Sequence, residues 1–335
     1  MARRAQATGT IAAAGEFGFL ARILPRIPPG PGAVVGPGQD CAVIRCGGQR
    51  FLVTVDALVE GVHFEAGWMS PRQIGRKSFL VNASDAAAMG GQPRFCLVSC
   101  GVRPSYPARD LCAVQAGIVE AAGEVGALVV GGNLTRAAQL FVSVTLLAQA
   151  PKRLVTRRGA HCGDRIYVTG SLGDAALGVR MLRARRGARP GLTRPIRRFR
   201  EPSPRLRAGT LLIESGVVSA MIDVSDGLVQ DLGHICHESG VGAVIHSARL
   251  PVSTRYRAAV GADDSLALRG GEDYELLCTV PERNVKRLER VRKRLGCSIT
   301  CIGEITAGRR VQLRGADGTA RPLNGAGHDH FRGRL

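Results

Sequence analysis

Short apolar runs alternate with longer segments of helical spacing in the first half of the chain. The runs are rich in β-branched and aliphatic residues and bounded by glycines, which predicts β-strands. Apolar positions three and four residues apart predict helices over 72–90 and 108–125, the first ended by Gly90 and Gly91. The predicted strands cover residues 33–35, 41–44, 51–55, 95–102, 128–130 and 140–147.

The second half repeats this alternation. The predicted strands are 165–169, 220–222, 243–246, 275–280 and 298–305, the last being the final strand. The predicted helices are 174–185, 206–215, 228–238 and the charged segment 283–295. Residues 186–207 are rich in proline and arginine, and we predict that they form the main irregular connection.

Strands alternating with helices in both halves predict an α/β fold with mixed sheets. A length of 335 residues accommodates two domains. We place the boundary near Pro151, where a basic stretch separates two strand-rich blocks, so the expected domains are 1–150 and 151–335.

Composition narrows the class of protein. Hydrophobic residues make up 45% of the chain, and no window approaches 18 uninterrupted apolar residues, so a membrane-spanning helix is not expected. At the N-terminus we expect an irregular segment followed by a helix. The 10 cysteines lie mostly in apolar strings, which favours reduced, buried thiols and a cytoplasmic location. Their spacing in the Cys96/Cys100 and Cys297/Cys301 pairs does not favour a zinc site.

The formal charge of +19 is concentrated in an arginine block, residues 180–207, where eleven arginines face one acid, Glu201. We expect this block to be a solvated linker or the solvated face of a helix. Attraction of polyanionic substrates and incidental nucleic-acid binding are the alternatives. Only Phe199 interleaves with these arginines, and no nucleic-acid-binding motif is present, so nucleic acid is not an expected partner.

Five aspartates occupy positions typical of metal and phosphate chemistry. Asp40, Asp56, Asp85, Asp223 and Asp226 follow apolar runs or small residues and stand near glycines. A carboxylate is costly to bury unless it is paired or bound to metal. A single aspartate of this kind is more often a helix N-cap than a ligand. The five together predict a magnesium site that also binds substrate phosphates.

Glycine-rich turns follow three predicted strands, at 131–133, 170–173 and 270–274. Such turns let backbone amides approach phosphate oxygens. None of them matches the Walker pattern or the glycine loop of protein kinases, which disfavours those nucleotide-binding folds.

With these motifs in order, the chain resembles the thiamine-monophosphate kinase family from about residue 15 to 331. The resemblance is carried by Gly38-Gln-Asp-Cys-Ala42, Asp56-Ala-Leu-Val-Glu-Gly-Val-His-Phe64, Asn82-Ala-Ser-Asp-Ala-Ala-Ala-Met-Gly90, Asp223-Val-Ser-Asp-Gly-Leu228 and Gly271-Glu-Asp-Tyr-Glu-Leu276, with 15–17, 131–136, 156–170 and 329–331 between and around them. It implies the two-domain fold of the aminoimidazole-ribonucleotide-synthetase-like superfamily. It also implies a homodimer formed through N-terminal strands, with ATP bound near the interface.

The resemblance further implies direct transfer of the γ-phosphoryl group of ATP to thiamine monophosphate, assisted by several Mg²⁺ ions. Such transfer needs positioning and charge neutralisation more than covalent catalysis. By resemblance, metal ligands are Asp40, Thr54, Asp56, Asp85, Asp223 and Asp226, of which Asp85 and Asp223 are the catalytic pair. The implied nucleotide contacts are Gly132, Asn133, Arg157, Ser225 and Asp226, and the implied acceptor contacts are His63 and Glu272.

Four positions depart from the family pattern. Gln39 and Asn133 stand where the family carries carboxylates, Val55 replaces a threonine, and Gly325 falls where an aromatic residue packs on thiamine. These departures leave two alternatives open. One is a kinase of the same fold acting on a different small acceptor, and the other is a non-catalytic protein that binds ATP or anions.

Overall fold

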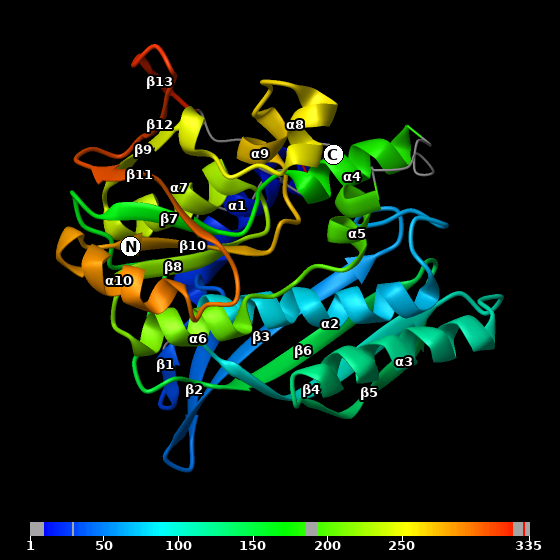
Figure 1. Ribbon diagram of the computed structural model, residues 1–335. Coiled ribbons are helices and arrows are strands. Elements are labelled where there is room, and N and C mark those ends of the chain that lie inside the picture. Colours follow the sequence, from blue (N-terminus) through cyan, green and yellow to red (C-terminus); the bar gives the residue numbers. More distant parts are fainter. Residues whose placement is uncertain (1–9, 29, 185–192, 324–330, 332–335) are drawn as a thin grey trace.

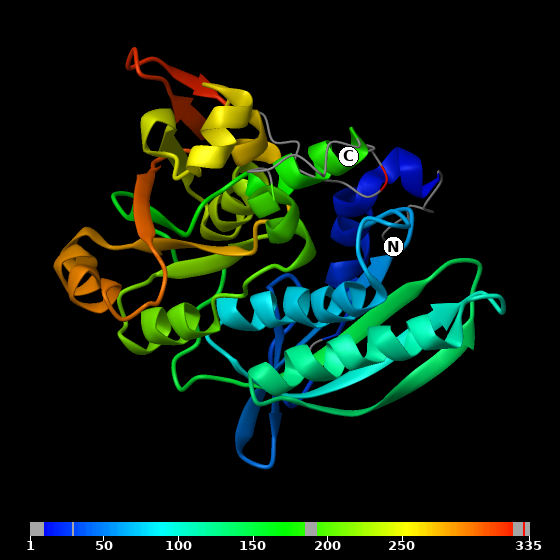
Figure 2. The same cartoon turned by 45° about the vertical axis from the view of Figure 1, so that its right-hand side comes forward.

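Two β-sheets enclose a central helix. The structure, a computed structural model, describes residues 10–28, 30–184, 193–323 and 331. Within this part of the chain the strands form one six-stranded and one seven-stranded sheet. Both views in Figures 1 and 2 show helix α2 (Pro71–Ala88) between them. The predicted α/β class with mixed sheets is confirmed, whereas the domain boundary near residue 150 stays a prediction.

The first sheet has the strand order β1-β2-β3-β6-β4-β5. Its strands are β1 (Ala33–Val35), β2 (Ala42–Cys46), β3 (Gln49–Val59), β4 (Gln92–Val102), β5 (Leu128–Arg136) and β6 (Phe141–Gln149). Neighbours are antiparallel except β4 and β5. Alternate residues of β6 are buried, because one face packs against α2 and α3 (Ala108–Glu124). The two helices approach closely at Gly75, where a Cβ would lie 1.9 Å from the Val114 carbonyl oxygen.

Helix α2 begins with a capping box. The Ser70 hydroxyl accepts from the Gln73 backbone N–H, and the Gln73 side chain accepts from the Ser70 N–H. From Lys77 to Ala88 nearly every side chain is buried, because both sheets pack on the helix. The buried polar groups of α2 must therefore find partners inside the protein, and several of them meet the candidate site.

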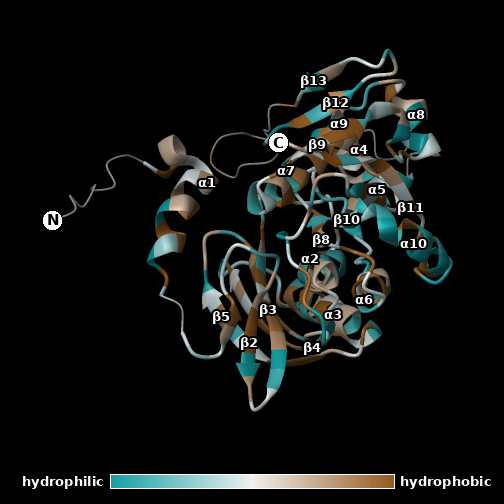
Figure 3. Ribbon diagram, turned by 90° about the vertical axis from the view of Figure 1, so that its left-hand side faces the viewer, coloured by the Kyte–Doolittle hydropathy of each residue, from teal (hydrophilic) through white to brown (hydrophobic). Residues whose placement is uncertain are grey.

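The second sheet has the order β13-β12-β9-β11-β7-β10-β8 and is antiparallel except for β12 and β9. Its strands are β7 (Arg165–Thr169), β8 (Ala220–Val224), β9 (Gly242–His246), β10 (Glu275–Val280), β11 (Ile299–Thr306), β12 (Val311–Arg314) and β13 (Ala320–Pro322). Its helices are α4 (Asp174–Arg183), α5 (Thr193–Arg200), α6 (Leu206–Glu214), α7 (Leu228–Ser239), α8 (Thr254–Val260), α9 (Ser265–Arg269) and α10 (Val285–Arg292). One face packs against α4, α7 and α9, the other against α6 and α10. The outer surface of α10 is hydrophilic (Figure 3).

The prediction of an irregular connection over 186–207 is wrong for residues 193–200 and holds for residues 201–205, which lie between α5 and α6. Helix α5 forms over 193–200 and buries Ile196 and Phe199. The reading of the arginine block as a solvated linker is wrong for two of its members, because Arg198 and Arg205 both bind the fully buried Glu275 carboxylate. A buried carboxylate requires such partners. Residues 185–192 of the block lie outside the described residues.

The remaining predictions concern the first helix, the last strand, the cysteines and membrane-spanning helices. Helix α1 (Ile11–Ile23) follows the start of the described chain, as expected. The strand over 298–305 is not the final one, because β12 and β13 extend the sheet beyond it. Five of the 10 free cysteines are buried and three are exposed, so the prediction of buried thiols holds for part of them. Among the described residues, no helix has the length and apolarity needed to cross a bilayer.

Candidate active site

Three predicted ligands converge at the junction of the two sheets. Asp40 precedes β2, Asp85 lies on α2 and Asp223 lies on β8. One carboxylate oxygen from each lies within 4.8 Å of the other two. Asp40 and Asp223 are buried, and Asp85 is partly exposed. Asp223 lies more than 130 positions from both Asp40 and Asp85 in the sequence, and the fold brings all three into one carboxylate cluster.

The electrostatics of the carboxylate cluster favour the binding of a cation. Burial, together with the neighbouring carboxylates, raises the pKa of Asp223 to about 8 and that of Asp85 well above its usual value. Burial also raises the pKa of Asp40, against the opposing effect of Arg157. Asp40 Oδ2 is buried and has no hydrogen-bond partner among the described residues. Carboxylate oxygens in this arrangement fit Mg²⁺, whose charge would offset their repulsion.

Hydroxyl groups orient two of the three carboxylates. Thr54 Oγ1 on β3 donates to Asp85 Oδ2 at 2.6 Å, and Ser84 Oγ on α2 donates to Asp223 Oδ2 at 2.6 Å. Thr54 was predicted as a metal ligand, and here it positions Asp85. The sequence pattern does not predict Ser84 as a site residue, although this residue lies inside the 82–90 motif. Each of these short hydrogen bonds restricts the orientation of the carboxylate that accepts it.

Asp56 lies at the edge of the carboxylate cluster. It is exposed, and its charge contributes to the raised pKa of Asp85. Its backbone N–H donates to Asn82 Oδ1 at 2.9 Å, and Asn82 Nδ2 donates to the Ser78 carbonyl. The buried Asn82 amide therefore holds the end of β3 against α2. Asn82, too, was missed as a site residue, although it opens the 82–90 motif.

Arg157 closes the opposite side of the cluster. Its guanidinium donates to Asp40 Oδ1 at 2.7 Å, and its backbone N–H donates to Gln39 Oε1 at 2.8 Å. Gln39, one of the departures from the family pattern, therefore anchors the backbone of a predicted nucleotide residue. Ser239 at the end of α7 also donates to the Arg157 carbonyl, at 3.3 Å.

The turn before α7 carries two further predicted residues, Ser225 and Asp226. Asp231 Oδ2 accepts from the Asp226 and Gly227 backbone N–H groups at 3.3 and 3.0 Å. Gln230 Nε2 donates to Asp226 Oδ2 at 3.0 Å. Burial and the charge of Asp226 raise the pKa of Asp231 well above its usual value. These bonds fix the turn directly after β8, next to Asp223.

A strained turn holds Glu272 beside Ser225. Glu272 and Tyr274 adopt φ angles of 75° and 51°, which non-glycine residues rarely do. The Glu272 N–H donates to the Ser225 carbonyl at 2.7 Å, and the Tyr274 N–H donates to the Val224 carbonyl at 2.8 Å. Burial, together with the charges of Glu272, Asp56, Asp223 and Asp85, raises the pKa of Tyr274 well above its usual value. Tyr274 thus lies within electrostatic range of the carboxylate cluster.

His63 lies in the loop that follows β3. Its Nδ1 accepts from the Val59 N–H at 3.0 Å, which in the neutral ring leaves the proton on Nε2. The ring is partly buried. This tautomer presents a donor, which suits an anionic or carbonyl group of a ligand.

Gly132 and Asn133 are separated from the carboxylate cluster. They lie on the edge strand β5, and β4 and β6 stand between β5 and β3. At about 4.8 Å per strand, this is a separation of roughly 14 Å. Asn133 pairs with Ser99, and both belong to the face that no helix covers within the described chain. The structure thus does not bring Gly132 and Asn133 to the aspartates of the same chain.

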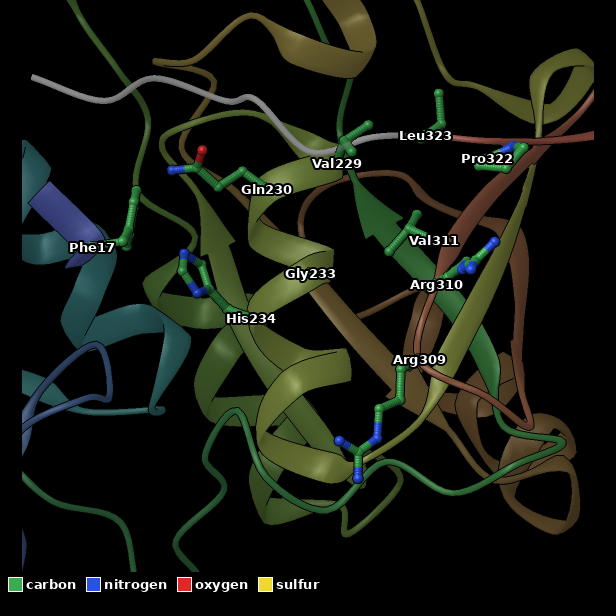
Figure 4. Close-up of a pocket in the computed structure, with 10 residues that line it drawn as sticks. All are labelled: Phe17, Val229, Gln230, Gly233, His234, Arg309, Arg310, Val311, Pro322 and Leu323. Atoms are coloured by element: carbon green, nitrogen blue, oxygen red, sulfur yellow. The ribbon is translucent and has the colours of Figure 1, made fainter. Parts of the chain in front are cut away.

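A separate pocket lies between α1, α7 and the β12–β13 edge (Figure 4). Its volume is about 340 Å³. Phe17 and His234 face one another across it, with ring centroids 5.4 Å apart, and Arg309 and Arg310 lie on the opposite wall. Gln230, which binds Asp226, also lines it. None of the predicted ligand residues is part of its wall as described, so it is not the metal site.

Two family models match the chain. "AIR synthase related protein, N-terminal domain" matches residues 38–150, and "AIR synthase related protein, C-terminal domain" matches residues 162–316. Together with the paired sheets and the carboxylate cluster, these matches define the class as AIR-synthase-related proteins. Within this class the chain belongs to the thiamine-monophosphate kinase family. The thiamine-monophosphate kinase of Escherichia coli (strain K12) is 36% identical over 326 residues, which are 95% of this chain and 99% of that relative.

Solved structures agree with this assignment. One described as "AaThiL complexed with AMPPCP and TMP" superimposes with a TM-score of 0.85 and 31% identity, covering 97% of this chain and all of that one. The thiamine-monophosphate kinase from Stenotrophomonas maltophilia K279a gives 0.75 and 34%, covering 91% and 98%. The predicted family is confirmed.

Proposed function

We propose that this protein transfers the γ-phosphoryl group of ATP to the phosphate of thiamine monophosphate, giving thiamine diphosphate. The convergence of Asp40, Asp85 and Asp223 within 4.8 Å carries the proposal. It is supported by the superposition on a relative described as complexed with AMPPCP, an ATP analogue, and TMP. Nearly complete coverage of both chains means that no part of that relative's fold is missing from the comparison.

Asp40, Asp85 and Asp223 would hold Mg²⁺, with Asp56 and Asp226 at the edges of the same site. When bound, Mg²⁺ neutralises phosphate charge and polarises the bond that breaks. Thr54 and Ser84 keep Asp85 and Asp223 oriented for this task. We assign Asp85 and Asp223 as the catalytic pair, because they are the two members of the carboxylate cluster that hydroxyl groups orient.

Arg157 and Ser225 would bind the nucleotide phosphates. Arg157 already uses its guanidinium on Asp40, so it can bridge the cluster and a phosphate oxygen. His63, through its Nε2–H, and Glu272 would contact the acceptor. The acceptor phosphate is ionised near neutral pH, so transfer needs no strong general base, and none is assigned.

We also propose that the protein is a homodimer that works in the cytoplasm. The uncovered face of the first sheet exposes Val55, Leu97 and Val130 at 61%, 44% and 56%. Apolar exposure of this extent is typical of an interface. Gly132 and Asn133 lie on the same sheet, so a second copy could bring them to a nucleotide. ATP and free thiols are both characteristic of the cytoplasm.

A second candidate function is a kinase of the same fold with a different acceptor. The observation that favours it is Gln39, which the structure uses to anchor Arg157 where the family has a carboxylate. ADP release measured over a panel of phosphorylated and alcohol acceptors separates the two. Thiamine monophosphate should give the highest kcat/KM. A higher value for another acceptor would replace the first proposal by the second.

A further inference from the structure

Lys77 is a fully buried cation in the middle of α2. Its side chain is 0% exposed, and Nζ lies 2.5 Å from Glu272 Oε2. Among the described residues Nζ has no hydrogen-bond partner, and Glu272 is its ion-pair partner. Burial lowers the pKa of Lys77, and the charge of Glu272 opposes that effect. A lysine is rarely buried without a specific partner, so this ion pair needs a structural or functional account.

Phe199 on α5 encloses the lysine from the other side. Lys77 Nζ lies 3.6 Å from the centroid of the Phe199 ring, and Trp68 meets that ring edge-on at 5.9 Å. A cation over an aromatic face is stabilised electrostatically, most strongly where water is excluded. The helix of the arginine block therefore fixes the position of Nζ through its one aromatic residue.

The partner carboxylate belongs to the strained turn beside Ser225. Glu272 Oε2 is buried against Lys77, whereas the side chain as a whole is 18% exposed. One oxygen is thus held by the lysine while part of the side chain remains exposed. The backbone of the turn is fixed independently, through Ser225 and through Gly173, whose N–H donates to Asp273 Oδ2 at 2.7 Å. Lys77 therefore adds the one constraint that the backbone does not supply, on the side-chain torsions of Glu272.

We infer that Lys77 is a positioning residue for the acceptor: it holds the Glu272 carboxylate in the rotamer that meets the acceptor, and Phe199 holds Lys77. The inference rests on the proposed function, which makes Glu272 an acceptor contact. A carboxylate paired with an ammonium also adds no net negative charge near an acceptor that already carries a phosphate. Loss of the lysine would leave the carboxylate free to rotate and to repel that phosphate.

The test compares Lys77→Met, Glu272→Gln and the double variant, with Phe79→Leu as a control. Phe79 is equally buried on α2 but belongs to the core of the first sheet, so its variant reports loss of stability alone. The affinity for thiamine monophosphate is measured by calorimetry, and KM and kcat by ADP release. Lys77→Met should weaken acceptor binding and raise the acceptor KM at least tenfold, with the KM for ATP within twofold. The double variant should be no worse than Glu272→Gln.

Several results decide against the inference. Acceptor affinity in Lys77→Met equal to that of Phe79→Leu overturns it, as does a double variant in which the two losses multiply. If Lys77→Met does not fold, Phe199→Leu decides, because it loosens the lysine and leaves both charges in place. An unchanged acceptor KM in Phe199→Leu then overturns the inference. Wild-type protein that binds thiamine monophosphate without ADP release contradicts the proposed function alone, and absence of binding contradicts both.

Discussion

Ser84 and Asp223 are joined by a hydrogen bond of 2.6 Å across 139 residues of sequence. The hydroxyl belongs to α2, which packs on the first sheet, and the carboxylate belongs to β8 at the edge of the second. Because both groups are buried, the bond fixes one layer relative to the other at the point where the carboxylate cluster forms. The integrity of the site and the packing of the two sheets are therefore coupled.

Stability without metal should fall as the pH rises. The pKa of Asp223 is raised from 3.8 to about 8, so the folded protein binds a proton that the unfolded chain releases near pH 4. Stability is therefore highest below that value and is lost progressively up to about pH 8. Thermal unfolding in EDTA at several pH values measures this loss. Mg²⁺ should restore the lost stability at pH 8. Asp223→Asn should make the profile less steep, and the rest of the slope should come from other buried carboxyl groups with raised pKa values, such as Asp85 and Asp273. A flat profile in the wild type would contradict the electrostatics described above.

ADP release should require a divalent cation, and Asp85→Ala should lower it by about two to three orders of magnitude. The substitution removes charge stabilisation that the transition state needs, worth several kcal/mol. Circular dichroism establishes that the variant is folded, and a Mg²⁺ titration measures the remaining activity. Near wild-type turnover in folded Asp85→Ala would remove the assignment of Asp85 as a ligand.

Two arginines of the arginine block should matter for stability and their neighbour should not. Arg198 and Arg205 both bind Glu275, which is fully buried and also accepts from Thr169 at 2.7 Å. Replacing both arginines by glutamine leaves an uncompensated buried charge and should cost about 3–5 kcal/mol. The exposed Arg197→Gln should change stability by less than about 0.5 kcal/mol. Urea unfolding compares them, and equal effects would show that burial of Glu275 is not decisive.

Gln39 should tune the affinity for Mg²⁺. Gln39→Glu keeps an acceptor for the Arg157 N–H and adds a negative charge beside Asp40, so the Mg²⁺ concentration for half-maximal activity should fall by about threefold, the effect of roughly 0.7 kcal/mol. Gln39→Leu removes the acceptor without adding charge and should instead raise the KM for ATP. Magnesium titrations at saturating ATP measure the first effect. A midpoint that rises in Gln39→Glu would mean that repulsion from Asp40 dominates.

Most strands and helices could be predicted because their signals are local. An apolar run such as 275–280 or a helical spacing such as 108–125 needs no information from the rest of the chain. Helix α5 could not be found in this way, because Pro195 and its arginines have the composition of a linker. Phe199 lies against Lys77 of α2, and Arg198 forms an ion pair with Glu275 of β10. Neither contact can be predicted from the local sequence.

The sequence by itself determined the family, the alternation of strands and helices, and the residue types suited to magnesium and phosphate. Tertiary structure alone decided which of those residues meet. The local sequence marks Asn133 as a site residue in the same way as Asp40, Asp85 and Asp223. Sheet order brings the three aspartates together, whereas the turn predicted at 131–133 is wrong, because these residues continue the edge strand β5. The reason is physical: local periodicity follows from backbone geometry, whereas proximity follows from which faces must be buried against each other.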